Sequence, residues 1–315
     1  MLYIESDCNR PQFNLALEEF VFFHKQEEVF MLWQNTASII VGKNQNTMAE
    51  IDYAYVTKEK IPVVRRLSGG GAVYHDMGNL NYTYIVNRNA YGDYVGFTKL
   101  LRDYLASLGL EAAVSGRNDV LVDGKKISGN AQYMHHDRLL HHGCILLGAD
   151  MTRLAKALKP DEEKIRSKGV RSVSGRVANI SDFIPITAEA FRTGFGAYVK
   201  AHTKAVPYIL TKDERQAVEK LEQEKYDTFA WNFGHSPKYA FHTKNRFVGG
   251  GVEVFLDIQE GIIRDAVIYG DYLDDAESIC RKLRGVPHNA EALKKVLSGV
   301  SLGTIHTEEL LRCFL

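Results

Sequence analysis

Residues 61–76 read IPVVRRLSGGGAVYHD, and this stretch decides which fold the chain adopts. The apolar run 61–66 predicts a strand that enters a glycine-rich turn, and a second strand is expected to begin at Gly71. Three successive glycines expose backbone N–H groups and let a ligand approach the main chain closely. The spacing matches neither GxxxxGK[ST] nor GxGxxG, which excludes a P-loop and a dinucleotide fingerprint.

Two arginines directly precede the glycines. Arg65 and Arg66 could together hold a phosphate and the polar end of a substrate. A triple glycine alone is equally consistent with a simple turn between strands. The paired arginines, and the His75–Asp76 pair that follows, favour a functional site.

Outside this stretch the chain mixes predicted strands and helices. Residues 79–86 (NLNYTYIV) alternate in the manner of a strand, and Asp123–Gly124 between two alternating runs predicts a hairpin. Amphipathic helices are expected at residues 14–25, capped by Asn14, and at 94–108, 187–201 and 211–224. The hairpins favour an α+β fold with a mixed, largely antiparallel sheet over a doubly wound parallel sheet.

The pattern changes near the C-terminal end. Residues 246–258 and 261–270 are predicted to be paired strands joined at Glu260–Gly261, and short helices are expected at 274–283, 290–296 and 308–314. We therefore expect a first domain over residues 1–240 and a small C-terminal accessory domain over residues 246–315. The charged, glycine-bearing stretch 159–175 is predicted to be a mobile loop that could serve as a lid.

Composition narrows the function classes. The 315 residues carry 39 basic and 39 acidic side chains, so there is no basic excess to attract nucleic acid. The four cysteines are scattered without a CxxC pair, which argues against a disulfide framework and a zinc site. Neither a signal peptide nor an apolar run of membrane-spanning length is apparent. We expect a cytoplasmic protein that binds neither membrane nor nucleic acid.

A second motif contains a lysine whose position is restrained. The segment GRND ends at Asp119, and DGKKISGNA follows at residues 123–131. Lys126 lies on the strand after a tight hairpin, where its ammonium could neutralise a carboxylate and an α-phosphate. Taken alone, a solvated surface pair of lysines is the better interpretation. Gly116 and Gly129 weaken that interpretation because both suggest close approach of the backbone.

The segment HHGCILL begins at His141. Adjacent histidines on a strand point to opposite faces, so His141 and His142 do not form a metal pair. A packed, hydrogen-bonded histidine is slightly favoured over direct catalysis. Cys144 is the one credible cysteine nucleophile, although a cysteine on an apolar strand is more often buried and inert.

These motifs in this order resemble the lipoate–protein ligase family over nearly the whole chain. They are RRLSGGGAVYHD, GRND with KKISGNA, HHGCILL, and WNFG followed by FVGGGVEV. The resemblance implies a catalytic domain related to biotin ligases and class II aminoacyl-tRNA synthetases, with an accessory domain. It further implies that ATP activates lipoate to lipoyl-AMP. The lipoyl group would then pass to a lysine of 2-oxoacid dehydrogenase E2 lipoyl domains or of the glycine-cleavage H protein.

The resemblance also implies residue roles. Lys126 would be catalytic, contacting both the lipoyl carbonyl oxygen and the α-phosphate. Mg²⁺ is expected on the phosphates, with Asp119 as a candidate to hold it or to orient Lys126. The residues expected at ATP and lipoyl-AMP are Arg66, Gly71, Ala72, Val73, Tyr74, Lys126 and Asp119. Those expected around lipoate are Arg65, Ser68, Gly70, His75, Trp33 and His142.

Three alternatives remain open. One is an ATP-independent octanoyl or lipoyl transferase with Cys144 as nucleophile, although such enzymes commonly lack the accessory domain. A second is a non-catalytic module that binds an adenylated or lipoylated ligand. A third, a biotin ligase, is weak because that family carries a GRGRxG-like loop. The acceptor protein and the use of octanoate are not decided by the sequence.

Overall fold

The chain folds into two compact units. The computed structural model describes residues 1–87, 90–115, 118–158, 176–236, 239–248, 250–270 and 276–315. The first unit comprises Met1–Lys43 and Ile61–Thr228, and the second comprises Asn44–Lys60 and Phe229–Leu315. The sequence-based division places residues 44–60 in the first domain, whereas the structure groups them with the C-terminal unit. The expected loop at 159–175 lies outside the described residues.

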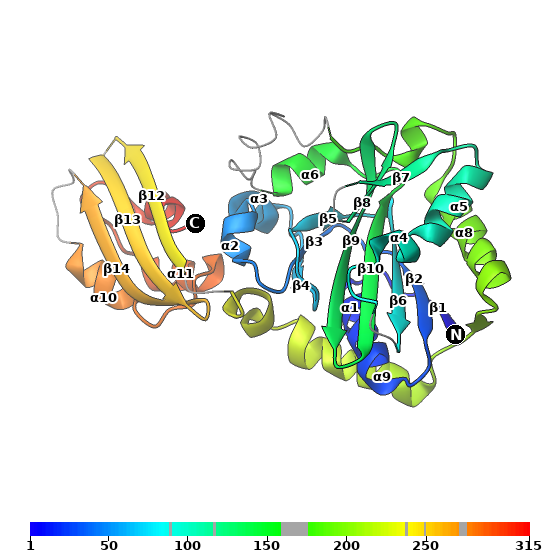
Figure 1. The fold of residues 1–315 in the computed structure, drawn as a ribbon. Coiled ribbons are helices and arrows are strands. Elements are labelled where there is room, and N and C mark those ends of the chain that lie inside the picture. Colours follow the sequence, from blue (N-terminus) through cyan, green and yellow to red (C-terminus); the bar gives the residue numbers. More distant parts are fainter. Residues whose placement is uncertain (88–89, 116–117, 159–175, 237–238, 249, 271–275) are drawn as a thin grey trace. The chain divides into compact units, whose positions relative to one another are not determined.

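The first unit is built on an eight-stranded sheet with the order β11-β1-β2-β6-β10-β9-β8-β7 (Figure 1). Its strands are β1 (Leu2–Glu5), β2 (Val29–Trp33), β6 (Asn79–Val86), β7 (Ala112–Ser115), β8 (Asp119–Val122), β9 (Lys125–His135), β10 (Arg138–Leu146) and β11 (Val206–Pro207). Only the pairings of β1 with β2 and with β11 are parallel. The predicted α+β fold with a mixed, largely antiparallel sheet is confirmed.

A small sheet carries the glycine-rich turn. It contains β3 (Ser38–Val41), β4 (Val63–Arg65) and β5 (Val73–His75), in the order β4-β3-β5. The predicted strands around the glycines are therefore confirmed, with shorter bounds. Strand β3 is parallel to β4 and antiparallel to β5, so the turn between β4 and β5 passes the end of β3.

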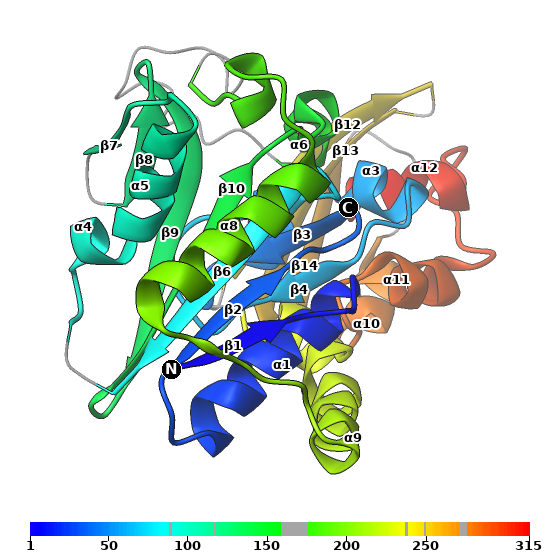
Figure 2. The ribbon, with the colours of Figure 1, turned by 90° about the vertical axis from the view of Figure 1, so that its right-hand side faces the viewer.

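Helices cover the two faces of the large sheet differently (Figure 2). Helices α4 (Tyr94–Phe97), α5 (Lys99–Ser107) and α8 (Ala188–Thr203) share one apolar core with the strands. Helix α1 (Pro11–His24) meets the opposite face. The remaining helical segments of this unit are α6 (Met151–Ala157), η2 (Ile180–Asp182), α9 (Lys212–Leu221) and η3 (Glu222–Tyr226).

Local signals explain most element boundaries. Thr187 and Thr211 cap α8 and α9 as predicted, and Asp123 and Gly124 adopt the positive φ angles of a tight hairpin, 48° and 74°. The predicted cap at Asn14 is wrong. Helix α1 begins three residues earlier, at Pro11, because proline suits the first helical position.

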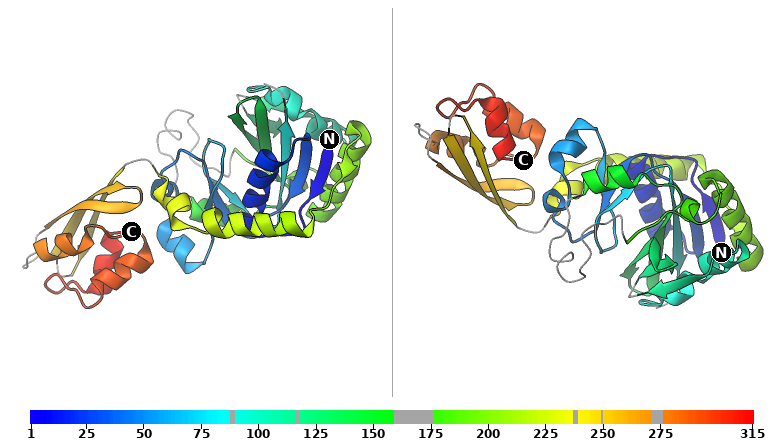
Figure 3. Two further views of the ribbon diagram at one scale, coloured as in Figure 1. Left: turned by 90° about the horizontal axis from the view of Figure 1, so that it is seen from below. Right: turned by 90° about the horizontal axis from the view of Figure 1, so that it is seen from above.

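The second unit is a three-stranded antiparallel sheet packed on helices (Figures 1 and 3). It contains β12 (Tyr239–Phe247), β13 (Gly250–Gln259), β14 (Ile262–Gly270), α10 (Glu277–Leu283), α11 (Ala290–Leu297) and α12 (Thr307–Cys313). Helices α2 (Thr47–Glu50), α3 (Tyr53–Lys58) and η4 (Ala230–Gly234) complete it. The predicted hairpin at Glu260–Gly261 is confirmed, whereas strand β12 was not expected from the sequence.

Candidate active site

The triple-glycine turn presents accessible main chain. Gly70 has a φ of +94°, a conformation that L side chains rarely adopt, and Gly70 and Gly71 are exposed. Ala72 and Val73 are half-buried, and Tyr74 is buried. A Cβ at Gly42, at the end of β3, would lie 2.0 Å from the Gly70 carbonyl oxygen. The turn therefore lies directly against the β3 backbone and leaves its outer peptide groups open to a ligand.

Arg66 holds this turn together. Its side chain is 6% exposed, and its Nη2 donates to the Gly69 and Gly71 carbonyl oxygens at 2.7 and 2.8 Å. Nη1 donates to the Ile40 carbonyl at 3.1 Å, and Nε donates to Ser68 Oγ at 3.0 Å. Burial lowers the pKa of the guanidinium to about 10, so it stays charged at neutral pH. The side chain is thus a structural part of the cradle.

Arg65 is also buried within the small sheet. Its Nη1 donates to the carbonyl oxygens of Gly42 and Lys43, at 2.9 and 3.0 Å. Burial lowers the pKa of this guanidinium to about 10 as well. Both predicted arginines therefore place positive charge beneath the turn, and both direct donors to main-chain carbonyls.

A hydrogen-bonded chain leads from Arg66 to a buried carboxylate. Arginine is donor-only, so Ser68 Oγ accepts from it and directs its own hydrogen to His142 Nε2, 2.6 Å away. His142 Nδ1 therefore carries the ring proton and donates to Glu18 Oε1 at 2.9 Å. Glu18 lies on α1 and is 1% exposed. The packed, hydrogen-bonded state predicted for His142 is confirmed.

Glu18 receives a second chain of donors from the large sheet. Trp33 Nε1 donates to Thr83 Oγ1 at 3.0 Å, and Thr83 Oγ1 donates to Glu18 Oε1 at 2.7 Å. No local sequence pattern marks Glu18 for this role, because its partners Thr83 and His142 are 65 and 124 residues away along the chain. One carboxylate thereby joins the glycine turn to Trp33.

Directly opposed residues form a row across five adjacent strands. Asp119 pairs with Gly129, Gly129 with Cys144, Cys144 with Asn81, and Asn81 with Trp33. Opposed residues project from the same face of a sheet. We call these five residues the cross-strand row. It runs from the second predicted motif at one end to Trp33 at the other.

Lys126 lies over the Asp119 end of the row. Its Nζ is 2.6 Å from Asp119 Oδ1, and a Cβ added to Gly129 would lie 2.7 Å from that same nitrogen. The Lys126 side chain is 33% exposed, so the ammonium is restrained by Asp119 and still reachable. Its backbone N–H donates to the Arg176 carbonyl, which holds the strand against the segment that follows. Of the two roles expected of Asp119, the geometry supports orientation of Lys126.

Comparison with known proteins identifies the family. The profile described as "Lipoyl protein ligase A/B catalytic domain" matches residues 10–200, and "Bacterial lipoate protein ligase C-terminus" matches residues 236–314. "Lipoate--protein ligase 1" of Staphylococcus aureus is 40% identical over 96% of both chains. The chain belongs to the lipoate–protein ligase family. The predicted enzyme class, an ATP-dependent lipoate–protein ligase, is thereby confirmed.

Solved structures of lipoate–protein ligases share the fold. The bipartite ligase of Thermoplasma acidophilum, described together with its E2 lipoyl domain, has a TM-score of 0.66 and 28% identity. It matches 76% of this chain and 98% of its own. A lipoate–protein ligase A bound with ATP has a TM-score of 0.63 and 25% identity, over 74% of this chain and 98% of its own.

In this ligase, Cys144 is a poor nucleophile. Its thiol is held in the middle of the cross-strand row, where Asn79 Nδ2 lies 3.3 Å from the sulfur. Burial raises the pKa of the thiol to about 12, and the nearby Lys126 charge offsets this only in part. Because the thiolate is the reactive form, the geometry disfavours the cysteine-dependent alternative.

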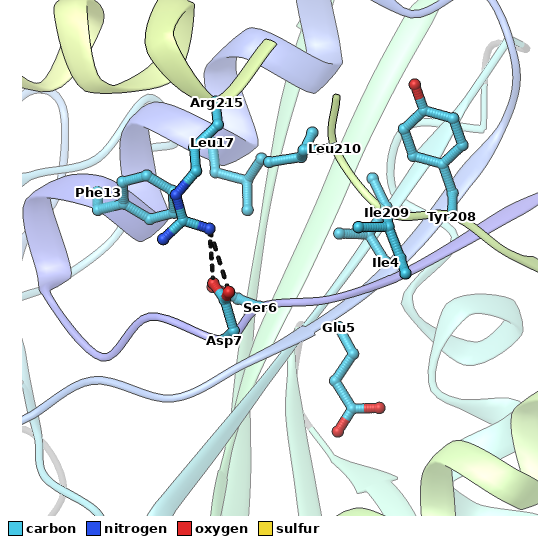
Figure 4. A pocket seen from close by; sticks show the side chains of 10 residues that line it. All are labelled: Ile4, Glu5, Ser6, Asp7, Phe13, Leu17, Tyr208, Ile209, Leu210 and Arg215. Atoms are coloured by element: carbon cyan, nitrogen blue, oxygen red, sulfur yellow. Dashed lines mark hydrogen bonds and ion pairs between the residues drawn. The ribbon is translucent and has the colours of Figure 1, made fainter. Parts of the chain in front are cut away.

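Two cavities formed by the described residues lie away from this chemistry. One, of about 270 Å³, lies beside β1 and α1 and is crossed by the Arg215–Asp7 ion pair (Figure 4). The other, of about 340 Å³, lies at the β9–β10 hairpin and includes the exposed His135 and His136. Neither cavity is lined by a predicted site residue.

The described residues were also compared with the requirements of a metal site and of a membrane-spanning helix. No group of three or more His, Cys, Asp or Glu side chains among them is placed to hold a metal ion. No helix in the same part of the chain has the length and apolarity that crossing a bilayer requires.

Proposed function

We propose that the protein uses ATP to convert lipoate to lipoyl-AMP and then transfers the lipoyl group to an acceptor lysine. The observation that carries this proposal is the Lys126–Asp119 pair over Gly129, at one end of a row that leads to Trp33. A charged end and a largely buried remainder suit a carboxylic acid with a long apolar tail.

Positive charge is the main requirement of the first step. A carboxylate oxygen of lipoate attacks the α-phosphorus of ATP, an oxygen–phosphorus bond forms, and pyrophosphate leaves. Two anions repel one another, and the Lys126 ammonium would stabilise both by contacting the carboxyl oxygen and the α-phosphate. The exposed peptide groups of the triple-glycine turn, held by Arg66, would contact the nucleotide.

The second step is aminolysis. The neutral ε-amine of an acceptor lysine attacks the carbonyl carbon of lipoyl-AMP, an amide bond forms, and AMP leaves with the oxygen. A mixed anhydride also reacts with water, so a buried acyl tail helps by excluding solvent around the adenylate. Glu18, His142 and Ser68 would hold the surrounding side chains in place during both steps.

Mg²⁺ would be carried mainly by the nucleotide. The described residues offer Asp119 as a single carboxylate near Lys126, and Mg²⁺ commonly combines one or two carboxylates with substrate phosphates. The ion would neutralise phosphate charge. Asp119 would then share its oxygens between the ion and the ammonium.

The acceptors that we propose are lipoyl domains of 2-oxoacid dehydrogenase E2 subunits or the glycine-cleavage H protein, in the cytoplasm. The related ligase described with its E2 lipoyl domain supports the first of these. We further propose that residues 1–240 carry adenylation and that residues 246–315 act as the accessory domain. The two matched family profiles support this division.

The test measures lipoyl-AMP directly. Purified protein is incubated with ATP, Mg²⁺ and lipoate, and lipoyl-AMP is quantified by mass spectrometry with and without an acceptor domain. Lys126→Ala should lower the rate at least about 100-fold, because losing one fixed donor to a developing charge costs about 3–4 kcal/mol. Wild-type adenylate yield from this variant would overturn the proposal.

Two controls come from the chain itself. Lys125 is the exposed neighbour of Lys126 on the same strand and has the opposite orientation. Lys125→Ala should therefore retain most of the activity. Omitting ATP should abolish acylation of the acceptor in both wild type and Cys144→Ala, whereas ATP-independent transfer would favour the cysteine mechanism.

A further inference from the structure

The side chain of His75 has a defined tautomer. Asn14 Nδ2 donates to the carbonyl oxygens of Cys8 and Gln34, both at 2.9 Å, which fixes the orientation of the Asn14 amide. The same nitrogen donates to Asn35 Oδ1 at 2.9 Å, so Asn35 Nδ2 is the donor toward His75 Nδ1, 3.2 Å away. His75 therefore carries its proton on Nε2.

That proton has no acceptor in the part of the chain that the structure describes. His75 is 3% exposed, and Nε2 is a buried atom without a hydrogen-bond partner. Burial and the neighbouring Arg66 and His142 lower the pKa of the ring to about 3, so it is neutral and keeps one N–H. An unsatisfied buried donor costs about 1–3 kcal/mol, and such donors are rare in native structures.

Asn81 provides a second donor of the same kind. It is 2% exposed, and within the described residues its Nδ2 has no partner. Asn81 stands opposite Trp33 in the cross-strand row, so both side chains project from one face. The His75 ring meets Trp33 edge to face, with centroids 6.2 Å apart. Two buried N–H donors thus lie beside Trp33.

A comparison with His141 shows that these donors are unusual. The Nε2 of His141 is also buried without a partner, but aromatic rings surround it, and Phe97 stacks on it at 4.7 Å. An N–H group can point at such rings. His141 contacts four aromatic rings, whereas among the described residues His75 contacts one, Trp33, and Asn81 lies between Trp33 and Cys144 in the cross-strand row.

The position of the donors indicates which part of the ligand they meet. Gly129, beneath Lys126, and Trp33 are separated by three strand spacings, or about 14 Å. This step rests on the proposed function: with the carboxyl group at Lys126, the acyl tail extends along the row toward Trp33. Along that tail the only hydrogen-bond acceptors are the two sulfurs of the dithiolane ring, which accept weakly.

We propose that His75 and Asn81 donate hydrogen bonds to the dithiolane sulfurs of lipoate and thereby determine the preference for lipoate over octanoate. Octanoate has the same chain without sulfur, so binding it leaves both donors unsatisfied in a buried place. A site with donors rejects a ligand that lacks the matching acceptor. Weak acceptors make the expected discrimination modest, about threefold to tenfold for each donor.

The experiment compares two acids on the full-length protein. The kcat/KM for acyl-AMP formation is measured with lipoate and with octanoate for wild type, Asn81→Leu and His75→Phe. Each variant should lower the lipoate-to-octanoate ratio about threefold to tenfold, and His141→Phe should leave the ratio at the wild-type value. An unchanged ratio in Asn81→Leu, or an equal loss for both acids, overturns the proposal.

Calorimetric titration of both acids into the ATP-free protein gives a second readout that does not depend on chemistry. The affinity ratio should follow the kinetic ratio. If His75→Phe does not fold, as judged by circular dichroism, Asn81→Leu decides alone. Failure of the proposed function gives a different result, because wild type would then form neither acyl-AMP.

Discussion

The two faces of the eight-stranded sheet differ in the kinds of side chain that they carry. On the face under α5 and α8, aromatic and aliphatic side chains form a continuous core, and rings such as Phe30, Tyr82 and Phe195 lie within 6.5 Å of one another. On the other face, Trp33, Asn81, Thr83, His142 and Cys144 project from the same strands, and all of them except Asn81 take part in polar side-chain contacts that the structure describes.

Strand alternation makes this difference possible. Consecutive residues point to opposite faces, so His141 lies among aromatic rings while His142 bonds to Glu18. The apolar face supplies stability by burial, at about 25 cal/mol per Å² of apolar surface removed from water. The polar face is therefore free to hold groups that cost energy to bury. Separate substitutions on the two faces should affect stability and activity differently.

The largest effect is expected where one carboxylate satisfies several donors. Glu18→Ala leaves His142 Nδ1 and Thr83 Oγ1 without their acceptor, and should lower the free energy of unfolding by roughly 2–4 kcal/mol. Adenylation should fall too, since Ser68 and Arg66 lie on the same chain. Urea unfolding and the lipoyl-AMP assay report the two effects.

A matched variant isolates the carboxylate. Glu18→Gln retains an oxygen acceptor of the same shape, so its loss of stability should be less than half that of Glu18→Ala. A Glu18→Ala protein as stable as wild type would show that the polar face does not depend on this residue.

Two glycines on neighbouring strands test the faces directly. A Cβ at Gly143 would lie 2.2 Å from Asn130 Oδ1 and 2.7 Å from the Tyr82 ring, so Gly143→Ala should lower stability by about 1–3 kcal/mol. A Cβ at Gly129 meets only the flexible end of Lys126 and, more distantly, Asp119. Gly129→Ala should therefore leave stability nearly unchanged and lower adenylation, by up to about 100-fold for a displacement near 1 Å.

The same two assays separate these glycines. If Gly129→Ala unfolds as readily as Gly143→Ala while its adenylation activity is normal, Gly129 does not lie on the face that holds the active site, and the prediction is wrong.

Lowering the pH should destabilise the protein through a buried histidine beside each face. Burial lowers the pKa of His75 and of His141 from 6.5 to about 3. Between these values the unfolded chain binds protons that the folded chain does not, so stability falls as pH falls through 6.5 and continues to fall toward 3. From pH 7 to pH 5 each histidine should remove about 2 kcal/mol from the free energy of unfolding.

Urea titrations at a series of pH values check this. His141→Phe, on the apolar face, should remove about half of the pH dependence attributed to the pair. A pH dependence identical to that of wild type would mean that His141 is not buried in its neutral form.

The sequence predicted local features well and long-range partners poorly. The hairpin at Asp123–Gly124, the Thr187 and Thr211 caps and the strands around the triple glycine depend on neighbouring residues, and all were predicted. The role of Glu18 was missed because its partner His142 is 124 residues away and the pair forms only after α1 packs on β10.

For the functional residues too, the sequence predicted which residues belong to the site but not which partners they contact. Lys126 and Asp119 were both expected at the site, but their contact depends on the β8–β9 register, which contains an irregularity between Val120 and Leu121. Arg66 was expected to hold a ligand, and the structure shows its donors on main-chain carbonyls of its own turn. Composition cannot distinguish these two uses of a buried guanidinium.

The second compact unit is assembled from two separate stretches, residues 44–60 and residues 229–315. Thr47 Oγ1 donates to the Asn232 carbonyl, and Tyr53 Oη accepts from the Ala290 N–H. The polypeptide consequently crosses between the units three times, near residues 43, 60 and 228. If the chain were cut near residue 228, residues 44–60 would stay on the first fragment and lose the residues of the second unit on which they pack. A form of this enzyme encoded as two separate polypeptides would therefore require that residues 44–60 be lost or redesigned.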